Sequence, residues 1–89
     1  MYIQEIIKNS IIDAFENIFQ IKPNTIELQQ TKKEFEGDIT FVVFPLVKEL
    51  KLRPREIAEK IGDYLVVNSS VVSFNIVSGC LNLSIADEQ

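Results

Sequence analysis

The hydrophobic residues of this chain recur with either a helical spacing or a strand-like alternation, and a helical segment followed by two strand-like segments occurs twice. In residues 3–19, and again from Pro54 to the polar stretch at 68–70, apolar side chains recur at three- and four-residue steps, as one face of a helix requires. Each segment is followed by two shorter ones that alternate apolar and polar residues, as half-buried strands do: 25–31 and 38–43, then 72–77 and 80–85. The pattern predicts the order α-β-β-α-β-β.

Proline and glycine stand where these segments should end or begin. Pro23 ends the first helix, because the residue before a proline is pushed out of the helical conformation. Pro45 stops the second strand and opens a short helical turn over 46–50, and Pro54 starts the longer helix. Gly79 supplies the last hairpin turn, since glycine adopts a positive φ without strain.

Each predicted helix carries one apolar stripe and each predicted strand one apolar face. The economical packing is an α+β two-layer sandwich, with a four-stranded antiparallel sheet and both helices on one face. We expect a single domain over residues 1–89, with a polar exit at 87–89. The predicted core combines the helix stripes with the inward strand residues Ile26, Leu28, Ile39, Phe41, Val43, Phe74, Ile76, Leu81 and Leu83.

The composition excludes several chemistries. With no histidine and one cysteine, the chain cannot form a Ser-His-Asp triad, a His-ligated zinc site or an internal disulfide. Nine basic and thirteen acidic residues give a net charge of −4, which disfavours a general nucleic-acid binder but leaves a local RNA contact open. No apolar run reaches the roughly 18 residues that span a bilayer, and the N-terminus lacks a signal-peptide pattern. We therefore expect a cytoplasmic domain without membrane or DNA partners.

The sheet face away from the helices is expected to be open and polar. Its amides and hydroxyls could hydrogen-bond the base edges of unpaired RNA, although contact with water is the simpler interpretation. Residues 31–60 hold seven of the nine basic residues, which are candidate phosphate contacts, but also six acidic residues, so a solvated surface is again the simpler interpretation. The outward polar residues are Gln29, Thr31, Thr40, Ser73, Asn75, Asn82 and Ser84.

Candidate catalytic and metal-binding groups are few. Glu34, Glu36 and Asp38 crowd one connector, but their spacing does not match a calcium-binding loop, which favours a solvated acidic loop. Cys80 lies in a predicted strand with no nearby base in the sequence, which favours a structural role. We predict no catalytic and no metal-ligating residue.

Four stretches resemble a known family. They are Phe-Glu-Gly-Asp-Ile at 35–39, Leu-Val-Lys-Glu-Leu at 46–50, Arg-Pro-Arg-Glu-Ile-Ala-Glu-Lys-Ile at 53–61 and Ser-Gly-Cys-Leu-Asn-Leu at 78–83. Over essentially its whole length the chain resembles the N-terminal additional domain of arginyl-tRNA synthetase. That family typically has Gly-Asp-Tyr, a Leu-Ala-Lys helix end, Asn-Pro-Arg-Glu-Ile-Ala and a closing Pro-Gly-Phe-Ile-Asn-Phe hairpin.

The resemblance implies a domain that docks the D-loop at the corner of tRNA(Arg). In the family, an aromatic residue and an asparagine of the closing hairpin stack on and hydrogen-bond an unpaired base. By position these are Cys80, which lacks a stacking face, and Asn82. The closing turn, the polar sheet face and the basic residues of 31–60 supply the rest of the predicted tRNA-binding set: Gly79, Asn75, Ser73, Lys32, Lys33, Arg53 and Arg55.

Asn82 should project from the open face, opposite Leu81 and Leu83. In that position Asn82→Ala should change stability by no more than about 0.5 kcal/mol, as an exposed substitution does. The alternative is that the Asn82 side chain caps the hairpin turn by bonding backbone near Gly79.

The resemblance also implies that catalysis lies in other domains. The family binds ATP, with magnesium, through a His-Ile-Gly-His-like motif, and this chain has no histidine. No cofactor is therefore expected here, and the implied partners are tRNA(Arg) and the rest of the synthetase chain. The alternative is a free-standing α+β protein-interaction or regulatory module with no RNA role.

Overall fold

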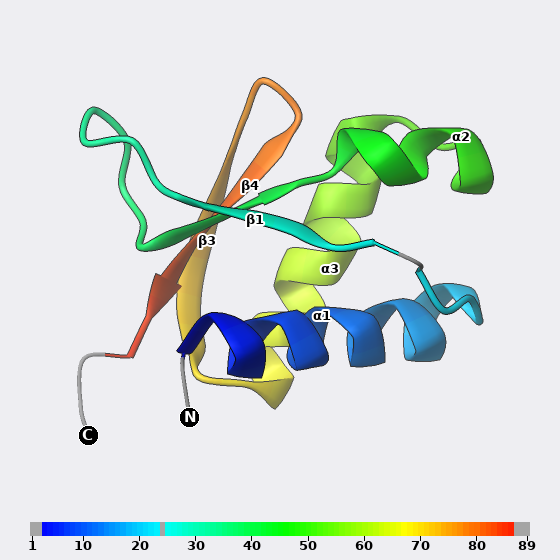
Figure 1. Cartoon of the computed structure of the whole chain (residues 1–89), viewed down its shortest axis with the longest axis horizontal. Coiled ribbons are helices and arrows are strands. Elements are labelled where there is room, and N and C mark those ends of the chain that lie inside the picture. The colour runs from blue at the N-terminus through cyan, green and yellow to red at the C-terminus, as the bar shows by residue number, and fades with distance from the viewer. Residues whose placement is uncertain (1–2, 24, 87–89) are drawn as a thin grey trace.

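The computed structural model describes residues 3–23 and 25–86. The predicted order α-β-β-α-β-β is confirmed, and the helical turn expected at 46–50 appears as two short helical elements before the second long helix (Figure 1). The expected polar exit at 87–89 lies outside the described residues. The elements are α1 (Ile3–Phe19), β1 (Glu27–Gln30), β2 (Ile39–Val42), η1 (Phe44–Leu46), α2 (Val47–Leu50), α3 (Pro54–Asn68), β3 (Val71–Val77) and β4 (Cys80–Ile85).

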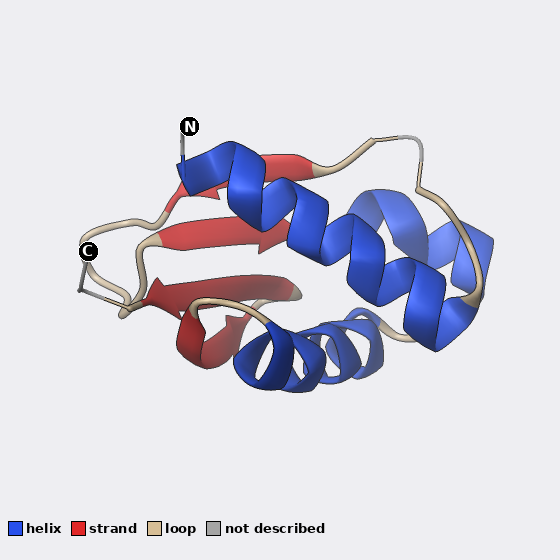
Figure 2. Ribbon diagram, turned by 90° about the horizontal axis from the view of Figure 1, so that it is seen from below, coloured by secondary structure: helices blue, strands red, loops and turns tan. Residues whose placement is uncertain are grey.

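The four strands form one antiparallel sheet in the order β1-β2-β4-β3. In the two central strands Thr40 lies opposite Asn82, and Asn82 in turn lies opposite Asn75 on β3. The helices α1 and α3 lie on the same side of the sheet and contact each other (Figure 2). The predicted two-layer sandwich is confirmed.

The core lies between the helices and the inward face of the sheet. Phe15 on α1 meets Phe41 on β2 edge to face, with ring centroids 6.0 Å apart and planes at 78°. Phe74 also faces the helices, as predicted, and packs so close to Gly62 that a β-carbon there would lie 2.8 Å from the ring. The buried hydrophobic residues are Ile7, Ile11, Ala14, Phe15, Ile39, Phe41, Val43, Leu46, Ile57, Ala58, Ile61, Leu65, Val71, Leu81 and Leu83.

The start of α3 follows from the Arg-Pro-Arg-Glu stretch. Arg53 is the extended N-cap residue and Pro54 is the first helical residue, where its missing N–H and fixed φ cost nothing. The Arg53 N–H donates to Oε1 of Glu56 at 3.3 Å, which satisfies a backbone donor that the helix leaves free. Residues 53–56, which begin one of the four stretches that carry the family resemblance, thus also fix where the helix begins.

A polar contact joins the two long helices. The Tyr64 hydroxyl on α3 donates to Oδ2 of Asp13 on α1 at 2.9 Å, and Nδ2 of Asn17 lies 3.2 Å from the same hydroxyl. The hydrogen bond to Asp13, with burial and the negative charge of Asp13 adding to it, raises the pKa of Tyr64 above its ordinary 10.0. The folded state therefore favours the protonated Tyr64 phenol over the phenolate.

The start of β3 differs from the prediction. The alternating pattern of 72–77 placed Val72 on the apolar face, but Val72 is 58% exposed and Val71 is 1% exposed. The register of β3 against β4 shifts between Val71 and Ser73, and such a bulge exchanges the faces on either side of the extra residue. The first strand is also shorter than predicted, with Ile26 and Leu28 half-buried beside the core.

Candidate nucleic-acid interface

The connection between β1 and β2 folds back over the outer face of the sheet. Gly37 has a φ of +136°, and a β-carbon on it would lie 3.2 Å from both Cβ of Asn82 and Oγ1 of Thr31. The Asp38 N–H donates to the Leu83 carbonyl at 2.7 Å, and the Ile85 N–H donates to Oδ2 of Asp38 at 2.8 Å. The Gly-Asp pair therefore holds this loop against β4, and only glycine fits where the backbone crosses Asn82.

Beneath this loop a chain of hydrogen bonds crosses the sheet. Thr40 Oγ1 donates to Oδ1 of Asn82 at 2.6 Å, so the 2.9 Å bond between the two threonine hydroxyls has Thr31 as its donor. Nδ2 of Asn82 donates to Oδ1 of Asn75 at 3.1 Å, and Nδ2 of Asn75 donates to the Glu36 carbonyl at 2.9 Å. The network links β2, β4 and β3, together with Thr31 just after β1, to the loop above them.

The structure corrects the expected position of Asn82. Its side chain points away from Leu81 and Leu83, as predicted, but the residue is only 2% exposed because the loop covers it. Thr31 and Thr40 are likewise buried, so this face of the sheet is not open along its whole length. Nor does the Asn82 side chain cap the hairpin turn, since its bonds go to Thr40 and Asn75. The sequence reveals which way the side chain points but not what lies above it.

A hollow of about 230 Å³ opens beside the covered network, between the loop and the β3–β4 turn. Asn82 contributes to its lining, and Cys80 lines it as a half-buried thiol. Phe35, on the loop, is 38% exposed and lines the same hollow. The full lining is Gln29, Gln30, Lys32, Phe35, Thr40, Val77, Ser78, Cys80 and Asn82. The hollow combines one aromatic ring with amides, hydroxyls and one ammonium group.

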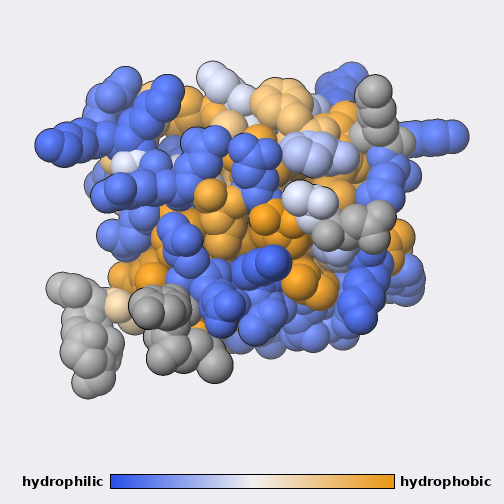
Figure 3. Space-filling model, viewed as in Figure 1, coloured by the Kyte–Doolittle hydropathy of each residue, from blue (hydrophilic) through white to orange (hydrophobic). Residues whose placement is uncertain are grey.

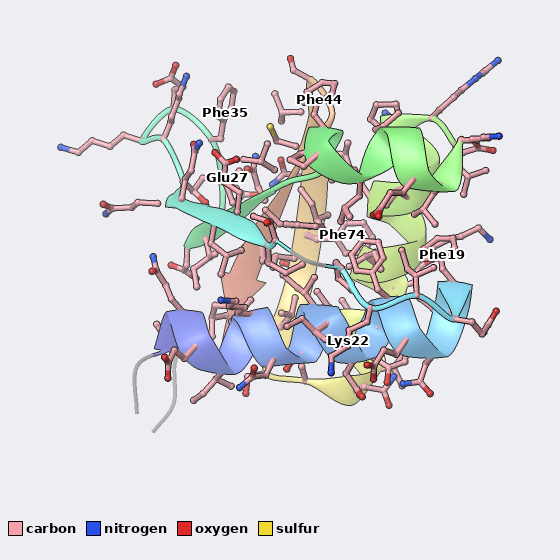
Figure 4. All side chains as sticks on the ribbon, turned by 45° about the vertical axis from the view of Figure 1, so that its right-hand side comes forward. Phe19, Lys22, Glu27, Phe35, Phe44 and Phe74 are labelled. Atoms are coloured by element: carbon pink, nitrogen blue, oxygen red, sulfur yellow. The ribbon has the colours of Figure 1, made fainter. Side chains whose placement is uncertain are left out.

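The β3–β4 turn forms one border of the hollow and rests on a second exposed ring. Ser78 and Gly79 have φ values of 52° and 78°, so both central residues of the turn are left-handed. A β-carbon on Gly79 would lie 2.8 Å from the ring of Phe44, which is 54% exposed, and 3.3 Å from Pro54. Figure 4 shows Phe35 and Phe44 at the same end of the molecule, whereas Lys22 lies at the opposite end beside α1.

The predicted tRNA-binding residues divide into separate places. Lys32 joins Cys80 and Asn82 in the hollow, and Lys33 is exposed on the same loop. Arg53 is exposed at the start of α3, next to the turn at Gly79. The remaining three lie on the β3 side: Asn75 is half-buried in the network, Ser73 is exposed, and Arg55 pairs with Glu59 at 3.5 Å.

Sequence reasoning missed Phe35 as a site residue and did not predict that the nearby ring of Phe44 would be exposed. Phe35 is an aromatic residue between charged neighbours, a placement that no strand or helix period explains, and that was the available signal. Phe44 follows an alternating strand and precedes a proline, which gave no sign that its ring would be exposed.

Among the described residues, those that line a hollow between β1 and the start of α1 include none of the predicted tRNA-binding residues. On the side viewed in Figure 1, hydrophobic surface gathers between β1 and α1 within a hydrophilic surround (Figure 3). A second hollow of about 230 Å³ lies there, lined by Gln4, Glu5, Lys8, Ile26 and Leu28. Within residues 3–23 and 25–86, no group of three or more His, Cys, Asp or Glu residues is placed to hold a metal ion. No helix in that part of the chain has both the length and the apolar composition to cross a membrane.

Both the sequence and the fold of this chain match known proteins. Residues 1–85 match the family described as the arginyl tRNA synthetase N terminal domain. The chain is similar to the arginine–tRNA ligases of Flavobacterium psychrophilum (44% identity), Amoebophilus asiaticus (42%) and Bacteroides thetaiotaomicron (39%), and 97–99% of it is covered in these comparisons. It spans only 15–16% of the length of these relatives.

A solved structure shares the fold. The arginyl-tRNA synthetase of Thermus thermophilus superposes with a TM-score of 0.79 at 24% identity, over 94% of this chain and 14% of that one. The chain is thus an α+β domain of the kind found in aminoacyl-tRNA synthetases. It belongs to the arginyl-tRNA synthetase N-terminal domain family.

Proposed function

We propose that this chain is the tRNA-binding domain of an arginine–tRNA ligase and docks the D-loop corner of tRNA(Arg). The observation that carries the proposal is the hollow that brings Cys80 and Asn82 together with Phe35 and Lys32. The relatives' names support the identity of the parent enzyme. Arginine, ATP and magnesium would bind in the remainder of the ligase, which would carry out the ligation in the cytoplasm during protein biosynthesis.

The hollow offers the groups that an unpaired base requires. The amides of Gln29 and Gln30 and the hydroxyl of Ser78 provide donors and acceptors for a base edge. Lys32 in the hollow, with Lys33 and Arg53 exposed nearby, can meet the phosphates on either side of that base. Asn82 supports the hollow indirectly, because its hydrogen bonds to Thr40 and Asn75 hold the lining in place while its own amide is covered.

The charge of the domain sets the strength of this contact. With a net charge of −4, the domain can neutralise few phosphates. The exposed cations near the hollow can reach two or three phosphates. The logarithm of the affinity should then fall against the logarithm of salt concentration with a slope of about −2 to −3. The domain is expected to orient the tRNA and to contribute a modest share of the affinity.

The rest of the ligase needs a separate surface to pack against. Val67 is 80% exposed and Val72 is 58% exposed, and they lie on either side of the α3–β3 connection, at the end of β3 away from its turn. These valines are the apolar surface that we propose faces the remainder of the chain. That arrangement leaves the hollow free for RNA.

The test uses aminoacylation by the complete ligase carrying a charge reversal in the hollow. Lys32→Glu should raise the KM for tRNA(Arg) about tenfold and leave the KM values for arginine and ATP unchanged, because only the RNA contact is altered. Lys22→Glu makes the same charge change at the opposite end of the domain and should have little effect. Equal effects of the two variants, or no effect of either, would refute an RNA contact at the hollow.

A further inference from the structure

We infer that Phe35 supplies the aromatic surface on which an unpaired tRNA base stacks, in the place of a ring at position 80. This inference rests on the proposed function and adds to it the residue that holds the base. Phe35 is 38% exposed, does not belong to the hydrophobic core or to the side chains packed against it, and lines the hollow that contains Cys80. Its ring is therefore available to a ligand in a way that the rings of Phe15 and Phe41 are not.

The loop presents Phe35 in a fixed position. The Phe35 N–H donates to the Lys32 carbonyl at 3.0 Å, which closes a tight turn just before the ring. On the other side, the Glu36 carbonyl accepts from Asn75 at 2.9 Å, and Gly37 presses against Asn82. A ring held by its neighbours on both sides needs little ordering when a base arrives, so more of the stacking energy appears as affinity.

The small side chain at position 80 complements the ring at position 35. Cys80 opens β4 opposite Val42 and Val77, and its thiol occupies far less of the hollow than an aromatic ring would. A base entering between the loop and the turn could lie flat against Phe35 with its edge toward Gln29 and Ser78. The stacking surface would then come from the β1–β2 loop, across the hollow from the strand that carries Cys80.

Phe44 is a less suitable platform, although it is more exposed. Its ring lies within 2.8 Å of the position that a β-carbon on Gly79 would occupy, so the turn rests on one side of it. It does not line the hollow that contains Cys80, Asn82 and Lys32. Phe44 is therefore the matched control: an exposed phenylalanine at the same end of the domain, outside the proposed site.

The test measures the dissociation constant of the complete ligase for a tRNA(Arg) transcript by fluorescence anisotropy. Phe35→Leu keeps apolar bulk and removes the π face, and should weaken binding about 5- to 150-fold, the range that base stacking gives. Phe35→Tyr should bind within about twofold of the parent, and Phe44→Leu should do the same. Adding Cys80→Tyr to Phe35→Leu restores a ring on the other side of the hollow and should recover most of the loss.

Two outcomes overturn the role of Phe35 without refuting the RNA contact at the hollow, and a third refutes both. One is unchanged affinity of Phe35→Leu while Lys32→Glu still weakens binding, which would leave the RNA contact standing and remove only the platform. The other is an affinity loss in Phe35→Leu that accompanies a lower melting temperature and is shared by Phe35→Tyr, which would mean that the ring serves the fold. If neither Phe35→Leu nor Lys32→Glu changes affinity, both the platform and the proposed RNA contact at the hollow are refuted.

Discussion

Replacing Asn82 by alanine tests the covered polar network directly. The substitution removes the acceptor of the 2.6 Å bond from Thr40 and the donor of the 3.1 Å bond to Asn75. Each bond contributes about 0.5–1.5 kcal/mol net, and a buried hydroxyl left without an acceptor costs roughly 1–3 kcal/mol. Thr40 is only 8% exposed, so water cannot readily take the place of Asn82. The free energy of unfolding should therefore fall by about 2–4 kcal/mol.

Urea unfolding followed by circular dichroism measures this change. Ser84→Ala is the control, because Ser84 lies on the same face of β4 and forms no side-chain hydrogen bond with any described residue. It should cost less than about 0.5 kcal/mol. A double-mutant cycle of Asn82→Ala with Thr40→Val should give a coupling energy of about 1 kcal/mol or more. If Asn82→Ala lies within 0.5 kcal/mol of the parent, the loop does not seal this network in solution and the reasoning fails.

Three further outcomes follow from individual contacts. Gly37→Ala should cost about 1–3 kcal/mol, because its φ of +136° strains any other residue and the new β-carbon crowds Asn82; thermal melts that match the parent would contradict this. Phe74→Ala should cost about 2–3 kcal/mol in urea, less than a fully buried ring, because Phe74 is half-buried; a larger loss would mean that the ring is completely enclosed. Because the pKa of Tyr64 is higher in the folded state than its ordinary value of 10.0, the contact of the protonated phenol stabilises the fold fully below pH 10. That stabilisation is lost as the pH rises through the pKa of the folded state. Over this alkaline range the free energy of unfolding of Tyr64→Phe should therefore fall less than that of the parent. If the free energy of unfolding falls equally with pH in both proteins, the contact between Tyr64 and Asp13 does not contribute to the alkaline loss of stability.

The sequence predicted the fold because the two hydrophobic periods are clean over most of the chain. The apolar residues of α1 fit only one helix face, and those of β2 and β4 fit only one face of the sheet. Pro54 together with Glu56 marks the start of α3. The bulge that buries Val71 in place of Val72 was not predictable, because either of these two adjacent valines could take the apolar face and the choice depends on pairing with β4.

The site was predictable only in part. Alternation placed Asn82 and Thr40 on the outward face, and this was right. It gave no information about the loop above them, because the path of a charged connector depends on tertiary bonds such as the one that Asp38 accepts from Ile85. The burial of the network and the exposure of Phe35 both follow from that path, so a reading of strand faces alone could predict neither.

The most direct measurement of the central claim is a nuclear magnetic resonance titration of this ¹⁵N-labelled chain with tRNA(Arg). If the hollow is the RNA-binding site, the largest shifts and broadening should fall on the backbone amides of residues 32–36 and 78–80, while those of α1 change little. The changes should weaken as salt is raised, in line with a contact to two or three phosphates. Shifts centred on α1 or on the exposed valines near Val67, with residues 32–36 unaffected, would contradict the account.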